Sequence, residues 1–189
     1  FPDQFAEGVR IAKGIKLEGK FDSVTISGMG GSALPANLFR IYCNNLLKAN
    51  ADYKHFEIYI NRYYSLPPES YGSTTLNLIS SYSGNTEETI GSLEEAHTSN
   101  MPFIGLSSGG QIEELCSKYG APHVKLPIPN SSFQPRMGTG YFFGAILQIL
   151  INHNLLPDVT EELILLAEKL KTGSEKLEKE GKNLAKKIV

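Results

Sequence analysis

Five short apolar runs constrain the fold of this chain more than any other feature, because a longer helical pattern separates each run from the next. The runs have apolar residues at successive positions, which is typical of strands that are covered on both faces. Strands that alternate with helices predict βα units and a parallel sheet. We therefore expect an α/β fold, a three-layer α-β-α sandwich around a five-stranded parallel sheet. The predicted strands are Val24–Ser27, Phe56–Ile60, Leu76–Ser80, Phe103–Leu106 and His123–Leu126.

Helical patterns fill the gaps between these runs. Gly138–Asn152 is apolar on nearly every side, and such a helix is buried in the core or against another subunit. Pro35 is tolerated because it lies in the opening turn of the helix that we expect to begin at Ala33. The other predicted helices are Gln4–Gly14, Ala33–Leu47, a segment from Thr86 to the residue before Asn100, and Gln111–Tyr119.

The composition changes after Leu156, and we divide the chain there. Residues 1–156 form the predicted α/β domain, and residues 157–189 form a predicted C-terminal helical extension. Gly173 and Gly181 are expected to break or loosen the helix in this extension. The extension either packs on the domain or connects it to something further along the chain. Its apolar residues at helical spacing are Leu163, Leu166, Leu170, Leu177, Leu184 and Ile188.

Two loops rich in glycine and hydroxyl groups lie between a predicted strand and a predicted helix. Gly28–Ser32 follows the first strand, and Ser81–Thr86 follows the third. The carboxyl ends of parallel strands share one edge of the sheet, where open α/β folds bind ligands. Ser81, Ser83 and Thr86 offer hydroxyl donors, a glycine permits a sharp turn, and the next helix adds its positive dipole end. This second loop can cradle a dianionic phosphate without a lysine.

Two other interpretations of these loops remain open. Serine, glycine, asparagine and threonine also form turns and cap helices without any ligand. The spacing of Gly28, Gly30 and Ala33 also matches the dinucleotide fingerprint, which requires an acidic residue at the end of the next strand. That strand is followed by Asn61 and Arg62, which disfavours NAD, although an arginine suits the 2′-phosphate of NADP.

Further candidates flank the two loops. Gly30–Ser32 suits a loop in which a compact ligand lies close to the backbone, with the serine as an additional donor. Arg136 precedes the buried helix and can stabilise negative charge that develops in a transition state. The sequence alone slightly favours the alternative, a structural arginine that satisfies loop carbonyls. We interpret Glu87 and Glu88 as partners of the helix dipole rather than as catalytic bases. The candidate binding residues are Gly30, Gly31, Ser32, Ser81, Ser83 and Thr86.

Charge and composition exclude several classes of function. The net charge of −2 does not indicate binding to nucleic acid or to an anionic membrane. Cys43 and Cys116 fall in predicted helices as buried, inert thiols, which fits a reducing compartment. The four histidines show no metal-ligand spacing. The longest apolar stretch, Tyr141–Ile151, is too short to span a bilayer. We expect a cytoplasmic protein without a metal or other cofactor.

Four segments of the chain resemble, in order, the first sugar isomerase (SIS) domain of the bifunctional phosphoglucose/phosphomannose isomerases. They are Gly28–Ser32, Ser81–Thr86, Ser107–Gly110 and Pro135–Arg136. The resemblance covers about residues 2–151 and implies the flavodoxin-like SIS fold, a sugar-phosphate ligand and a homodimer. It also implies the family reaction, which interconverts glucose or mannose 6-phosphate with fructose 6-phosphate through a cis-enediolate. The implied site has a phosphate held by Ser32, Ser81, Ser83 and Thr86, and an enediolate steadied by Arg136.

The sequence departs from the family pattern in one respect. The family places its base glutamate and its ring-opening histidine in a second SIS domain, which would begin after Val189. The chain starts without Met and resembles an excised piece. We therefore nominate no base, and we expect the chain alone to bind hexose 6-phosphates with little isomerase activity. The alternative is a stand-alone SIS protein, which would be another sugar-phosphate isomerase or a non-catalytic sensor of sugar phosphates.

Overall fold

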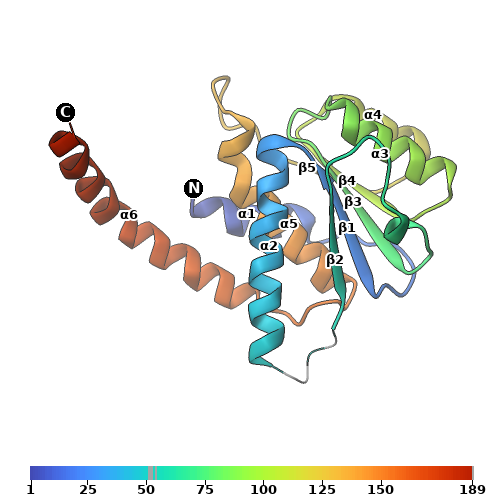
Figure 1. The fold of residues 1–189 in the computed structure, drawn as a ribbon, viewed down its shortest axis with the longest axis horizontal. Helices are drawn as coiled ribbons and strands as arrows, with labels where there is room; N and C mark the ends of the chain where they lie inside the picture. Colours follow the sequence, from blue (N-terminus) through green and yellow to red (C-terminus); the bar gives the residue numbers. More distant parts are fainter. Residues whose placement is uncertain (51–52, 54, 189) are drawn as a thin grey trace.

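The computed structural model describes residues 1–50, 53 and 55–188. Its strands are β1 Ser23–Gly28, β2 Glu57–Asn61, β3 Thr75–Ser80, β4 Phe103–Ser107 and β5 His123–Lys125. They form one parallel sheet in the order β2-β1-β3-β4-β5 (Figure 1). The predicted α/β architecture with a five-stranded parallel sheet is confirmed.

Helices alternate with the strands and form two layers around the sheet. The first layer contains α1, α2 and α5, and the second contains α3 and α4. Two short 3-10 turns, η1 and η2, lie in the connecting segments. The bounds are α1 Asp3–Ala12, α2 Gly30–Ala49, η1 Pro68–Ser70, α3 Glu87–Thr98, α4 Gly110–Tyr119, η2 Pro135–Gly138, α5 Thr139–Asn152 and α6 Thr160–Ile188.

The sheet divides the hydrophobic core in two, because successive strand residues point to opposite faces. Leu76 and Leu78 of β3 join the larger cluster beneath α1, α2 and α5, whereas Ile79 joins a smaller cluster beneath α3 and α4. Cys43 and Cys116 are buried free thiols, one in each cluster. Burial raises the pKa of these thiols to about 12 and about 11, so both are unreactive at neutral pH, as the sequence predicts.

Glycines let α1 and α5 pack with their backbones in contact. A Cβ atom on Gly144 would lie 2.2 Å from the carbonyl oxygen of Phe5, and one on Gly8 would lie 2.4 Å from a carbonyl oxygen of α5. No larger residue fits at such distances. The N–H of Gly140 also donates to Oε1 of Gln4 at 3.2 Å. This packing confirms that α5 is buried and fixes the start of α5, which directly follows η2.

Two helices differ from the sequence expectation. α2 begins at Gly30 rather than at Ala33, so Pro35 lies in its second turn and leaves one helical carbonyl without its usual N–H partner. α6 runs unbroken through Gly173 and Gly181, where we expected a break or loosening. A single glycine costs a helix only about 1 kcal/mol, and the leucine, glutamate and lysine residues around these two glycines offset that cost.

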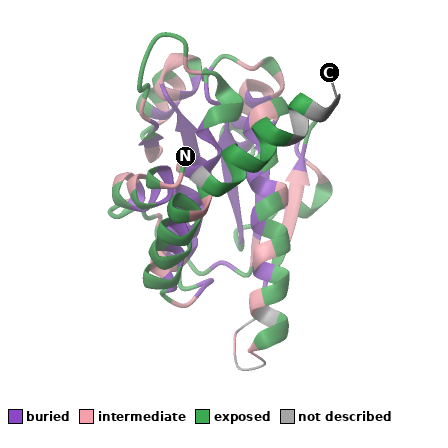
Figure 2. Ribbon diagram, turned by 90° about the vertical axis from the view of Figure 1, so that its left-hand side faces the viewer, coloured by how far each residue is buried: buried purple, intermediate pink, exposed green. Residues whose placement is uncertain are grey.

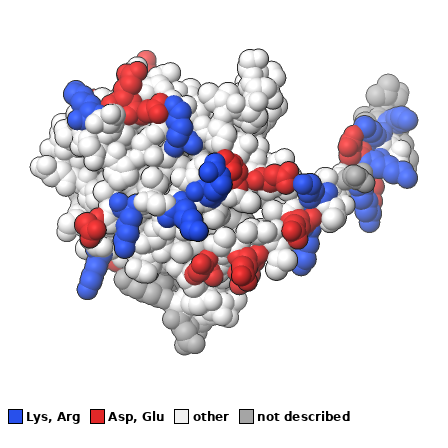
Figure 3. All heavy atoms as spheres, turned by 180° about the vertical axis from the view of Figure 1, so that it is seen from behind, with Lys and Arg blue, Asp and Glu red and all other residues white. Residues whose placement is uncertain are grey.

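α6 projects away from the rest of the molecule (Figure 1), and most of its residues are exposed (Figure 2). Its first turns add Leu163 and Ala167 to the larger core cluster, whereas Leu170 and Leu177 are exposed. Basic and acidic side chains alternate along its surface in Figure 3, as expected of a solvated face. Val189, the last residue of the predicted extension, lies outside the described residues. No helix in the described chain is both long enough and apolar enough to cross a membrane.

Candidate functional site

The two predicted ligand loops lie next to each other at the carboxyl edge of the sheet (Figure 1). Gly28, the last residue of β1, pairs with Ser80 at the end of β3. From there α2 passes to one face of the sheet, and α3 passes to the other. This divergence is the topological switch point of an open parallel sheet, which is where such folds bind ligands.

The loop between β3 and α3 brings three hydroxyl groups together. Ser81 Oγ lies 2.8 Å from Thr86 Oγ1 and 3.5 Å from Ser83 Oγ. The N–H of Gly84 donates to Ser81 Oγ at 3.2 Å, and the N–H of Asn85 donates to Ser83 Oγ at 3.3 Å. Because a hydroxyl proton rotates to suit its partner, this group can direct several donors at one anion. We call residues 81–86 the cradle.

The hydroxyl groups of the cradle lie at the start of α3. Ser81 is only 1% exposed, Thr86 is half-buried and Ser83 is exposed, so the group runs from the interior to the surface. Thr86 is the N-cap residue of α3, yet its side chain makes no capping hydrogen bond and its hydroxyl meets Ser81 instead. The positive end of the helix dipole therefore adds to the hydroxyl donors, and the cradle is electrostatically suited to an anion.

The start of α4 braces the cradle from the other side. Gly84 has φ +72°, and a Cβ atom there would lie 1.7 Å from the carbonyl oxygen of Gly109, so the sharp turn and the close contact both require glycine. The N–H of Ile112 donates to the Gly84 carbonyl, and the N–H of Gln111 donates to Asn85 Oδ1, each at 3.0 Å. Sequence reasoning missed this role of Asn85, because nothing local indicates which helix the amide side chain will reach.

The first loop meets both the cradle and the segment of Arg136. Ser32 is 6% exposed, and its Oγ accepts the backbone N–H of Tyr82 at 2.9 Å. Gly30 is exposed with φ +50°, and Gly31 is half-buried. A Cβ atom on Gly31 would lie 2.8 Å from the backbone nitrogen of Arg136. The structure therefore brings all the candidate residues to one side of the sheet edge.

Arg136 lies in η2, exposed to solvent. Its carbonyl accepts the hydroxyl of Thr139 at 3.0 Å. Across residues 1–50, 53 and 55–188, its guanidinium makes no hydrogen bond or ion pair. It does not satisfy loop carbonyls, which was the structural alternative that the sequence left open. The guanidinium is therefore available to a ligand.

Other polar groups near this edge are occupied within the fold. Asn61, the last residue of β2, is 2% exposed and donates to Ser27 Oγ at 3.2 Å and to Ser92 Oγ at 3.1 Å. It cannot also bind the ribose of a dinucleotide. Glu87 accepts the hydroxyl of Tyr64 at 3.4 Å, and the charges of the glutamates at positions 87 and 88 raise the pKa of Tyr64. This contact agrees with a structural role for Glu87.

His123 lies near the loop that follows β4 but faces inward. Ser107 Oγ donates to the carbonyl of Gly109 at 2.8 Å and lies 2.8 Å from Nε2 of His123, so this ring nitrogen is the donor to the serine. Burial lowers the pKa of His123, which keeps the ring neutral at physiological pH. Within the part of the chain that the structure describes, no three His, Cys, Asp or Glu residues are grouped to hold a metal ion.

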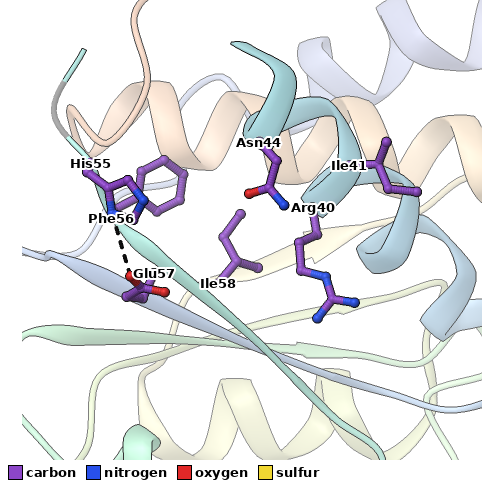
Figure 4. Close-up of a pocket in the computed structure, with 7 residues that line it drawn as sticks. All are labelled: Arg40, Ile41, Asn44, His55, Phe56, Glu57 and Ile58. Carbon is purple, nitrogen blue, oxygen red and sulfur yellow. Dashed lines mark ion pairs between the residues drawn. The ribbon is translucent and has the colours of Figure 1, made fainter. Parts of the chain in front are cut away.

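A hollow of about 470 Å³ lies between α2 and the beginning of β2 (Figure 4). His55 Nδ1 approaches Glu57 Oε1 to 3.6 Å there, and Arg40 and Asn44 extend from α2. Because β2 begins at Glu57, the hollow lies toward the amino edge of the sheet, away from the switch point. None of the candidate binding residues lines this hollow, and the cradle remains the candidate site.

Comparison with known proteins identifies homologues. The bifunctional phosphoglucose/phosphomannose isomerase of Caldicellulosiruptor bescii is 33% identical over 99% of this chain and 54% of its own length. Along nearly its whole length, the chain is homologous to bifunctional phosphoglucose/phosphomannose isomerases. The enzyme of the same name from Thermoplasma volcanium is 34% identical over 88% of this chain and 48% of its own. No protein-family model matches the chain.

The fold agrees with this homology. A Bacillus subtilis protein described as a phosphosugar isomerase superposes with a TM-score of 0.59, over 98% of this chain and 53% of that chain, at 19% identity. At this identity the similarity shows a shared fold, which is that of the SIS phosphosugar isomerases. The chain spans about half the length of these bifunctional phosphoglucose/phosphomannose isomerases.

Proposed function

We propose that this chain is the sugar-phosphate-binding domain of an aldose–ketose isomerase, which interconverts glucose or mannose 6-phosphate with fructose 6-phosphate. The supporting observation is the convergence of the Ser81, Ser83 and Thr86 hydroxyls at the N-terminus of α3, at the switch point of the sheet. A phosphate dianion accepts hydrogen bonds from hydroxyls and from the N–H groups of a helix start. The identity of the sugar in this proposal, a hexose, comes from the names of the relatives.

In this proposal the phosphate binds in the cradle, with Ser32 as an additional hydroxyl. The sugar extends toward Gly30 and Gly31, where the absence of side chains lets a compact ligand approach the backbone. The reaction moves a proton between C2 and C1 of the open-chain sugar through a cis-enediolate. The exposed guanidinium of Arg136 stabilises the negative charge that develops on the enediolate oxygens.

The reaction also needs a general base and an acid for ring opening. Glu87 and Glu88 are poor candidates, since carboxylates beside a bound phosphate would repel it unless they pointed away. We propose that residues 1–156 are the binding domain and that the helical segment 157–189 leads to a second SIS domain with both groups. The chain alone would then bind hexose 6-phosphates with little turnover. We further propose a cytoplasmic homodimer.

An NMR titration tests the binding proposal. Fructose 6-phosphate should shift the backbone amide signals of residues 81–86, whereas fructose should leave them unchanged. Ser81→Ala and Thr86→Val should each weaken binding about tenfold, since each removes a donor to a charged oxygen. Ser73→Ala provides the control, because Ser73 is exposed just before β3, at the opposite edge of the sheet. Shifts confined to residues elsewhere in the chain would contradict the proposal.

The same samples test whether this chain contains the general base, and a longer protein separates the isomerase from the sensor. If the sugar signals of glucose 6-phosphate convert rapidly to those of fructose 6-phosphate with this chain alone, then the base lies within residues 1–189 and that part of the proposal is wrong. If a protein in which this chain is joined to the proposed second SIS domain binds the sugar phosphate but does not convert it, the non-catalytic sensor is correct.

A further inference from the structure

The backbone of Tyr82 joins three of the loops at the carboxyl edge of the sheet. Tyr82 lies between Ser81 and Ser83 in the cradle and is 5% exposed. Its N–H donates to Ser32 Oγ at 2.9 Å, which connects the cradle to the loop after β1. Its carbonyl accepts the N–H of Ser108 at 2.9 Å and the hydroxyl of Ser108 at 2.6 Å, which connects the cradle to the loop after β4.

The side chain of Tyr82 reaches the loop between β5 and α5. Its hydroxyl donates to the carbonyl of Pro127 at 2.6 Å. Its ring lies 5.5 Å from the ring of Phe133, and a Cβ atom on Gly138 would lie 3.1 Å from two of its carbons. These contacts lie at the beginning, the middle and the end of the loop that carries Arg136. One side chain therefore contacts the loop on both sides of the arginine in sequence.

The rest of this loop has few attachments to the domain. Ile128 and Met137 are 61% and 50% exposed, and the turn at residues 130–132 is held by bonds from Ser132 to Asn130 within the loop itself. Two other contacts hold the loop: η2 packs on α2, where a Cβ atom on Gly31 would meet the backbone of Arg136, and the ring of Phe133 lies near Tyr141 of α5. Without the tyrosine contacts, the loop would keep this packing on α2 and α5 but would lose its attachment through Tyr82 to the cradle.

We propose that Tyr82 is a positioning residue that holds the β5–α5 loop, and with it Arg136, at a fixed place relative to the phosphate cradle. The inference rests on the proposed function, because the position of the arginine matters only if the cradle binds a phosphate whose sugar reaches it. A tyrosine suits this task because its ring packs in the interior while its hydroxyl satisfies a carbonyl. Burial raises the pKa of Tyr82 to about 12, so the hydroxyl remains a donor throughout the neutral range.

Hydrogen exchange of the ligand-free chain tests the structural half of the inference. Tyr82→Phe keeps the ring and removes only the bond to Pro127. We expect amide exchange in residues 128–137 to rise about tenfold, with little change in residues 81–86. The control is Tyr141→Phe, since the ring of Tyr141 also lies near that of Phe133, with 6.2 Å between the ring centroids, and Tyr141 makes no side-chain hydrogen bond within the described chain. Equal exchange of this loop in all three proteins would overturn the inference.

Two anions test the functional half. Inorganic phosphate probes the cradle alone, whereas 6-phosphogluconate adds a carboxylate near the position where enediolate charge would develop. Tyr82→Phe should weaken 6-phosphogluconate binding about fivefold to tenfold and change phosphate binding less than about twofold. Arg136→Gln should show the same selectivity, and the double variant should bind 6-phosphogluconate no more weakly than Arg136→Gln does.

The possible outcomes distinguish the inference from the proposed function. If the unmodified chain binds neither anion, the proposed function is wrong, whereas the exchange comparison still decides whether Tyr82 holds the loop. The inference is wrong if both anions bind but Tyr82→Phe weakens the binding of both equally. It is also wrong if the loss of 6-phosphogluconate affinity in the double variant equals the sum of the losses in Tyr82→Phe and Arg136→Gln, because Tyr82 then does not act through Arg136.

Discussion

Gly31 and Arg136 are in backbone contact: a Cβ atom on Gly31 would lie 2.8 Å from the nitrogen and 2.9 Å from the Cα of Arg136. The contact joins the first turn of α2 to η2, just before the buried helix α5. Any side chain at position 31 must push the arginine segment away from the first ligand loop. The glycine thus sets the distance between the loop that we propose to approach the sugar and the residue that we propose to stabilise the enediolate.

Gly31→Ala should therefore reduce both ligand binding and stability. We expect affinity for 6-phosphogluconate to fall about tenfold because Arg136 is displaced, and the free energy of unfolding to fall by about 1–2 kcal/mol from overpacking. Urea unfolding and calorimetric titration measure the two effects. Gly72→Ala is the control, since a Cβ atom there meets nothing within 4 Å. Unchanged affinity in Gly31→Ala would show that the arginine position is unimportant.

Gly84→Ala should lower the free energy of unfolding by more than the strain of placing alanine in a left-handed conformation, and it should disrupt the cradle. Gly84 has φ +72° and would place its Cβ atom 1.7 Å from the Gly109 carbonyl oxygen, whereas Gly120 has φ +66° and open space around its Cβ position. Gly120→Ala should therefore cost only the backbone strain, about 1–2 kcal/mol. Gly84→Ala should cost clearly more in urea unfolding and should also abolish phosphate binding. Equal costs would mean that the loop shifts freely away from α4.

Local signals in the sequence are sufficient for much of this site. The placement of Ser81, Ser83 and Thr86 between a buried strand and a helix start fixes where they lie, because parallel strands share one carboxyl edge. The sharp turn at Gly84 also follows from the residue type, since glycine adopts positive φ without strain. The burial of α5 follows from its apolar residues on every side.

Long-range contacts are what the sequence does not reveal. An aromatic residue between two cradle serines is the only local signal at Tyr82, and its bond to Pro127 depends on how the β5–α5 loop returns to the sheet edge. The contact between Gly31 and Arg136 depends in the same way on the packing of α2 against η2 and α5. The first turn of α2 was missed because glycine has low helix propensity, and tertiary contacts outweigh that preference at Gly30 and Gly31.

The packing of α1 against α5 gives a test of stability that is independent of the ligand site. Gly144→Ala should lower the free energy of unfolding by about 3 kcal/mol, because the added methyl group would lie 2.2 Å from the carbonyl oxygen of Phe5. Gly181→Ala makes the same chemical change in α6, where a Cβ atom meets nothing within 4 Å. It should leave global unfolding unchanged and stabilise its helix by up to about 1 kcal/mol. Similar urea midpoints for the two variants would contradict the close helix packing.

His153 should make the fold less stable as the pH falls below neutrality. Its Nε2 accepts the N–H of Leu17 at 2.9 Å, so Nδ1 carries the proton and donates to the carbonyl of Ile149 at 2.7 Å. Only the neutral ring makes both bonds. Burial is the main cause that lowers the pKa of His153 below its ordinary value of 6.5, and the charge of Lys16 lowers it further.

The sign of the pH effect follows from linkage. The unfolded chain takes up a proton at His153 near pH 6.5, and the folded protein does so only at a lower pH. The contribution of His153 to stability is therefore complete above about pH 6.5, falls as the pH drops through the lowered folded value, and changes no further below it. We expect the urea midpoint to decrease as the pH is lowered from about 7.5 to about 5.5. His153→Gln should be less stable at pH 7.5 but should lose less on acidification, and the residual loss should come partly from His123, whose pKa burial also lowers. If His153→Gln loses as much stability as the unmodified chain over the same pH interval, then His153 has the same pKa in the folded and the unfolded chain. That result would contradict a buried, neutral His153.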